Sequence, residues 1–84
     1  MSSKDELEEK ITLLLKDVMP ERSEKTLNNI TEDIIELTYD LKDIERIRKL
    51  VFGELAFISD KTSNEIIEVS QEIGEEILKT KISD

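Results

Sequence analysis

The sequence contains no cysteine and no histidine. These absences exclude disulfide bridges, thiolate nucleophiles, zinc sites of the usual cysteine and histidine kind, and acid–base catalysis by imidazole. Only one proline and two glycines occur in 84 residues, so few positions interrupt regular secondary structure. No apolar run approaches the roughly 20 residues of a membrane span, and the polar N-terminus lacks the apolar segment of a secretory signal. We therefore expect an intracellular, cytoplasmic protein that does not enter the membrane.

Charged residues make up 39% of the chain and hydrophobic residues 37%, with 21 acidic against 12 basic side chains. This composition still supplies enough isoleucine, leucine and valine for one hydrophobic core. A domain of this length buries only about 60–65% of the surface that its unfolded chain exposes, so its stability margin is thin. The sequence therefore predicts a single acidic domain over residues 1–84, which oligomerisation or a larger partner would stabilise.

Apolar residues recur at intervals of three and four, which is the spacing of one face of an α-helix. The first segment shows this pattern in Leu7, Ile11, Leu14, Leu15 and Val18. Pro20 ends the segment, because proline disfavours the helical conformation of the residue before it. We expect an all-α fold, a small antiparallel bundle of three or four helices. The helices are expected at about residues 3–18, 23–41, 43–59 and 62–80, with the last few residues frayed.

Capping residues mark where some of these helices begin. Ser3 followed by Glu6 matches the capping box, in which each side chain bonds to the backbone amide of the other residue. Thr62 followed by Glu65 matches it again. Ser23 is a typical N-cap for the second segment.

Residues 23–59 admit two interpretations. Apolar residues alternate steps of three and four from Leu27 to Ile44, as in a coiled-coil seam, and the same register continues beyond with a single charged interruption. One interpretation is a single long helix. The other is two helices that break near residues 41–43, with Asp43 as the N-cap of the second. We favour the break because helices average about 11–12 residues, although no glycine or proline marks it.

Residues 43–61 carry no net charge, whereas the segments before and after them are negative. They also hold the densest apolar cluster, which covers more than one stripe of a helix. Such a helix is either central in its fold or contacts something outside it. In the second case Phe52 or Phe57 stays exposed, because aromatic anchors are typical of interface hot spots. The candidate partner-binding residues are Leu50, Phe52, Leu55, Phe57 and Ile58.

The last segment lines one helix face with carboxylates, and residues 32–40 repeat the pattern in the second segment. The simplest interpretation is a solvated face that keeps the protein soluble. The alternative is a surface complementary to a basic partner, because a contiguous negative patch steers association with positive surfaces. The candidate acidic residues are Glu65, Glu68, Glu72, Glu75 and Glu76.

Two smaller features stand apart from these patterns. Arg46, Arg48 and Lys49 form the only basic cluster, and it is too small and too close to acidic neighbours to predict direct nucleic-acid binding. Gly74 lies inside a predicted helix, where glycine costs up to about 1 kcal/mol relative to alanine. The close approach of a second helix would account for this glycine, and so would chance.

The residues suggest no catalytic or metal site. No segment resembles an EF-hand loop, and a di-iron bundle would need Glu-x-x-His pairs. Ser63 has no histidine to activate it, and neither glycine belongs to a phosphate-binding motif. We therefore expect a protein without enzymatic activity, cofactor or bound metal.

No motif identifies a family. In size, charge and helical character, the chain resembles the small acidic helical accessory subunits of archaeal or viral replication and transcription complexes. The sequence predicts an accessory subunit that docks on a larger protein with a basic surface, through residues 50–58 or the seam of residues 27–44. Two alternatives remain open. One is an acidic inhibitor that occupies a nucleic-acid-binding cleft in place of phosphates, and the other is a self-associating structural bundle that forms a homo-oligomer.

Overall fold

The computed structural model describes residues 3–83 and shows four helices: α1 (Ser3–Val18), α2 (Glu24–Thr38), α3 (Ile44–Ile58) and α4 (Ser63–Ser83). No strand occurs among these residues. The expected all-α bundle is confirmed in its four-helix form, and α1 ends before Pro20 as the sequence predicts.

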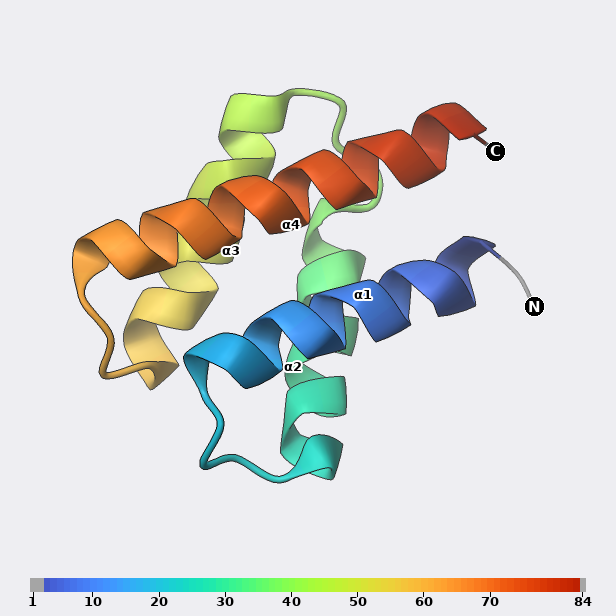
Figure 1. The fold of residues 1–84 in the computed structure, drawn as a ribbon. Coiled ribbons are helices and arrows are strands. Elements are labelled where there is room, and N and C mark those ends of the chain that lie inside the picture. Colours follow the sequence, from blue (N-terminus) through green and yellow to red (C-terminus); the bar gives the residue numbers. More distant parts are fainter. Residues whose placement is uncertain (1–2, 84) are drawn as a thin grey trace.

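The helices form two layers (Figure 1). α1 and α4 lie side by side and run in opposite directions, while α2 and α3 run across them in the second layer. Helices joined by a short connection, α1 with α2 and α3 with α4, therefore cross each other. The antiparallel neighbours are α1 with α4 and α2 with α3. The molecule measures 34 × 27 × 16 Å.

The core is built from aliphatic side chains and one methionine, and all four helices contribute to it. The buried hydrophobic residues are Leu7, Ile11, Leu15, Met19, Leu27, Ile34, Ile35, Ile47, Val51, Leu55, Ile66, Val69, Ile73 and Ile77. Tyr39 and Phe52 only border this core, and Phe57 lies outside it. Because burial of one such aliphatic side chain stabilises a fold by about 1.5–3 kcal/mol, the bundle gains its stability without a central aromatic ring.

The middle of the chain forms two helices, and the alternative of one long helix is wrong. α2 ends at Thr38, whose hydroxyl donates a hydrogen bond of 2.7 Å to the carbonyl oxygen of Ile34. α3 begins after Asp43, whose carboxylate accepts a hydrogen bond of 3.1 Å from the backbone amide of Glu45. An N-cap side chain such as Asp43 favours the start of a helix, so the break needs no glycine or proline.

The predicted seam of α2 turns only partly toward the core. Leu27 and Ile34 are buried, but Leu37 is 47% exposed. Thr31 takes an inward position, and its hydroxyl oxygen lies 2.9 Å from that of Thr12 on α1. A buried hydroxyl is tolerated when it finds such a partner. The buried face of α2 is therefore rotated away from the heptad pattern.

Most of the predicted helix caps are observed. Ser23 accepts a hydrogen bond of 3.2 Å from the backbone amide three residues on. Thr62 and Glu65 form the capping box, with reciprocal hydrogen bonds of 3.3 and 3.4 Å. The box expected at Ser3 lies outside the described side chains. α4 continues to Ser83, beyond the expected end near residue 80, because no glycine or proline follows in its last turns to end it.

Two contacts tie distant parts of the bundle together. The Lys10 ammonium lies 3.4 Å from the Glu76 carboxylate and joins α1 to α4. Arg22, in the connection between α1 and α2, donates a hydrogen bond of 2.8 Å to the carbonyl oxygen of Ile58 in the last turn of α3. This second bond satisfies a carbonyl that the helix itself leaves without a partner.

α3 and α4 approach each other closely at Gly74. A β-carbon at this position would lie 3.0 Å from Cδ1 of Ile44, 3.4 Å from Cγ of Arg48 and 3.5 Å from Cγ2 of Ile47. The close approach of a second helix therefore accounts for this glycine. Gly53 on α3 is different, because a β-carbon there would meet nothing within 4 Å.

Replacing each glycine by leucine tests this difference. Gly74→Leu pushes α3 away from α4 and should lower the free energy of unfolding by about 1–3 kcal/mol. Gly53→Leu fills open space and should raise it by less than about 1 kcal/mol, because leucine has the higher helix propensity. Urea unfolding followed by circular dichroism gives both values. Equal stability of the two variants would contradict the close helix approach.

Candidate interaction surfaces

The structure places the five predicted apolar residues in three different settings. Phe57 is 93% exposed, more than any other large hydrophobic residue in the described part of the chain. Leu50, Phe52 and Ile58 are half-buried. Leu55 is fully buried in the core, so it offers no surface to a partner.

Phe57 shares one line along α3 with Leu50 and Gly53, because positions spaced by three and four lie on the same helix face. Gly53 leaves open space one turn before the phenylalanine ring. We call Leu50, Gly53 and Phe57 the Phe57 face. Phe52 lies five residues earlier than Phe57, which corresponds to about 140° around a helix of 3.6 residues per turn. The two phenylalanines therefore belong to different surfaces.

Phe52 borders a surface hollow of about 230 Å³ between α3 and α4, which we call the α3–α4 hollow. Its lining residues are Glu45, Arg48, Lys49 and Phe52 from α3, and Ile67 and Ser70 from α4. Ile67 is 49% exposed, so the hollow has an apolar side that solvent reaches. The sequence singled out Phe52 and the basic residues Arg48 and Lys49. It did not connect them with Ile67 and Ser70, because only the packing of α3 against α4 brings these residues together.

Two polar atoms of the α3–α4 hollow are buried and have no hydrogen-bond partner: Oγ of Ser70 and Nε of Arg48. The whole Ser70 residue is only 2% exposed, so no solvent layer replaces the missing partner. An unpaired buried polar group costs about 1–3 kcal/mol. Folded proteins keep few such groups, and each one calls for a physical explanation.

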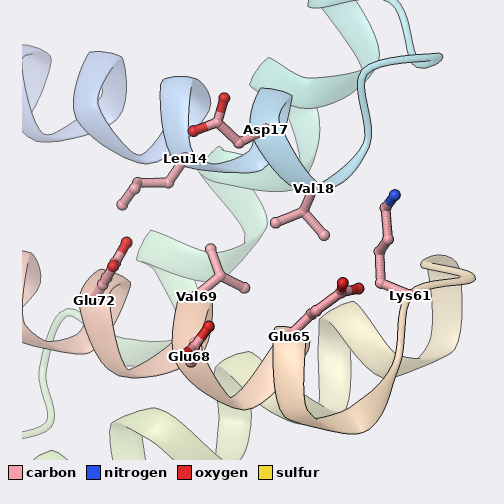
Figure 2. A pocket seen from close by; sticks show the side chains of 8 residues that line it. All are labelled: Leu14, Asp17, Val18, Lys61, Glu65, Glu68, Val69 and Glu72. Atoms are coloured by element: carbon pink, nitrogen blue, oxygen red, sulfur yellow. The ribbon is translucent and has the colours of Figure 1, made fainter.

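A second feature is an acidic groove of about 270 Å³ between α1 and α4 (Figure 2). Leu14 and Val18 reach from α1 toward α4, and Val69 forms the apolar part of the opposite wall. The charged lining residues are Asp17, Lys61, Glu65, Glu68 and Glu72. Carboxylates therefore outnumber cations around a partly apolar floor.

The five predicted glutamates do not form one continuous surface. The structure brings Glu65, Glu68 and Glu72 together in the acidic groove. Glu76 lies beyond the groove and forms ion pairs of 3.4 Å with Lys10 and 3.9 Å with Lys79. Glu75 is exposed and lies outside the groove lining. Asp17 joins the groove from α1, which sequence periodicity within one helix does not reveal.

No group of three or more acidic side chains is placed to hold a metal ion within residues that the structure describes. None of the helices in that part of the chain is long and apolar enough to cross a membrane.

Comparison with known proteins gives no relative, since no family model, curated protein or solved structure matches the chain.

The unpaired hydroxyl of Ser70 leads to a stability prediction. Ser70→Ala removes this buried group and should raise the free energy of unfolding by about 1 kcal/mol. Ser63→Ala, an exposed serine at the start of the same helix, is the matched control and should change it by less than about 0.5 kcal/mol. Chemical unfolding of both variants measures the difference. A destabilised Ser70→Ala would show that the hydroxyl has a bonding partner in solution.

Proposed function

We propose that this protein is a non-enzymatic interaction module, an accessory subunit that docks on a larger protein through the Phe57 face. The supporting observation is the position of Phe57, which is 93% exposed although the fold has an aliphatic core beside it. An exposed phenylalanine is a typical anchor for a pocket on a partner. Moving this side chain from water into such a pocket contributes about 1.5–3 kcal/mol to binding.

The charge distribution supports a partner whose docking pocket is apolar and whose rim is basic. α3 carries three basic and two acidic residues, whereas the chain as a whole has a net charge of -9. A partner that docks on α3 therefore meets a helix of nearly balanced charge on a protein that is negative as a whole. Basic surfaces of this kind are common on proteins of replication and transcription machinery, which bind phosphates. We propose a partner from that group.

Charge also argues against self-association through the same surface. A second copy would bring a second net charge of -9 close to the first, and like charges oppose association. A basic partner is attracted by the same negative charge, which also raises the rate of association. The larger basic protein is therefore the occupant that we propose for the Phe57 face.

The acidic groove supports a second candidate function. Asp17, Glu65, Glu68 and Glu72 surround an apolar floor between α1 and α4. An inhibitor that occupies a nucleic-acid-binding cleft in place of phosphates would present such a surface to basic side chains. Contact of this kind depends on exposed charges, which salt screens beyond about 8 Å at physiological ionic strength.

Salt and two variants distinguish the candidates. The tagged protein is used to capture partners from its native source, with parallel washes at about 0.1 M and 1 M salt. Docking through the Phe57 face should persist at 1 M salt, because apolar contacts are not screened. With the captured partner purified, Phe57→Ala should weaken binding by about 2 kcal/mol, roughly thirtyfold in Kd. The Glu68→Lys, Glu72→Lys double variant should change it far less.

Leu13→Ala is the matched control, because Leu13 is also exposed, at 64%, but lies on α1 away from α3. Its affinity should stay within about twofold of the unchanged protein. Loss of binding in 1 M salt and in the double glutamate variant, with Phe57→Ala unaffected, would establish the inhibitor instead. A mass above 9.7 kDa for the purified protein, reduced by Phe57→Ala, would overturn both in favour of self-association.

A further inference from the structure

The α3–α4 hollow joins three features. It has two buried polar atoms without partners, Oγ of Ser70 and Nε of Arg48. It has an apolar side formed by Phe52 and Ile67. It also has a second cation in Lys49. None of these features takes part in the Phe57 face.

Both unpartnered atoms can donate a hydrogen bond, so a ligand that supplies an acceptor would satisfy them. Nε of a guanidinium can only donate, and the serine hydroxyl donates readily to a charged oxygen. An anionic acceptor satisfies both better than a neutral one, because charge-assisted hydrogen bonds are about twice as strong. The positive charges of Arg48 and Lys49 favour the same choice.

Glu45 shows that the arginine already attracts a carboxylate. Its Oε1 lies 4.0 Å from Nη2 of Arg48, at the long limit of an ion pair, and the glutamate side chain is 70% exposed. This carboxylate approaches the outer end of the guanidinium and leaves Nε without a partner. A carboxylate that enters the hollow can therefore make a contact that Glu45 does not make.

The apolar side of the hollow determines which kind of chemical group can be attached to the anion. Phe52 is half-buried and Ile67 is 49% exposed, so a ligand gains by covering them with an apolar group. The volume of about 230 Å³ is below the roughly 300–1,000 Å³ of sites for drug-sized ligands. A short apolar chain or one side chain fits this space. Both atoms are shielded from solvent, so a ligand reaches them only after a side chain of the lining moves.

We propose that the α3–α4 hollow binds a carboxylate attached to a short apolar group. Arg48 and Ser70 hold the carboxylate oxygens, Lys49 adds positive charge, and the apolar group lies on Phe52 and Ile67. The ligand is either a small free carboxylic acid or the C-terminal residue of a peptide, since both carry this chemistry. The site does not depend on docking through the Phe57 face, because the two surfaces lie on different sides of α3.

Titration of the whole protein with hexanoate, followed by NMR, tests the site. Hexanoate should shift the methyl signals of Ile67 and the ring signals of Phe52 in a saturable way, with a Kd of about millimolar order for so small a ligand. Hexylamine has the same chain but the opposite charge and should not shift them. Because the protein carries a net charge of -9, an anion that binds without a specific site should show no saturation.

Substitutions identify the groups that hold the carboxylate. Ser70→Ala and Arg48→Met should each weaken hexanoate binding about tenfold, as expected for the loss of a hydrogen bond to a charged group. The matched controls Ser63→Ala and Arg46→Met should stay within about twofold. Glu45→Gln should tighten binding, because it removes a competing carboxylate. Circular dichroism of each variant separates loss of binding from loss of the fold.

Two peptides distinguish the sources of the carboxylate. Acetyl-Ala-Ala-Leu with a free carboxylate should shift the same signals, and its amidated form should not. Tighter binding of this peptide than of hexanoate assigns a peptide terminus, and binding of hexanoate alone assigns a small acid. Failure of both ligands to saturate these signals, or equal binding by Ser70→Ala, would overturn the proposal. Neither result bears on the capture experiment with Phe57→Ala.

Discussion

The packing of α3 side chains against Gly74 of α4 is the constraint that sets the two helices of the α3–α4 hollow side by side. α4 packs against both α1 and α3, so its position relative to α3 also fixes the spacing of the two layers. The same contact presses the stem of Arg48 against α4, one turn after Ser70. Arg48 and Ser70, whose Nε and Oγ lack partners within the fold, both line the hollow beside this contact.

The residues that hold the bundle together differ from those that it presents to solvent. The core is aliphatic, and the phenylalanines lie at its border or outside it. Phe57 therefore contributes nothing to the packing of the core. Ser70 lowers the stability of the fold, because its buried hydroxyl has no hydrogen-bond partner. The two proposed binding surfaces are therefore built on positions that are neutral or unfavourable for folding.

Local signals in the sequence predicted the helices well, because each boundary depends on residues close to it. Pro20 ends α1, and Ser23, Asp43 and the capping box at Thr62 begin the other three helices. The break between α2 and α3 was predictable for the same reason, although no glycine or proline marks it. The end of α4 was placed too early, since nothing local ends that helix.

Features that depend on packing between helices could not be predicted from the sequence. Apolar residues cover so much of α3 that their periodicity does not show which of them faces outward, and Leu55 was grouped with Phe57 although it is fully buried. Leu37 fits the heptad pattern of α2 yet stays partly exposed, while Thr31 takes a buried position against Thr12 of α1. Asp17 and Ser70 belong to surfaces built by two helices, so no pattern within one helix could identify them.

The hydrogen bond from Arg22 to the carbonyl of Ile58 has a consequence for the neighbouring residue. The last turn of a helix normally frays, because its carbonyls have no partners within the helix. Here a side chain from a connection 36 residues away fixes one of these carbonyls directly after Phe57. The backbone that carries the exposed ring is thereby held in place within the isolated protein. A partner that docks on the Phe57 face as proposed would lose less conformational entropy on association, so more of the energy of burying the ring would remain as affinity.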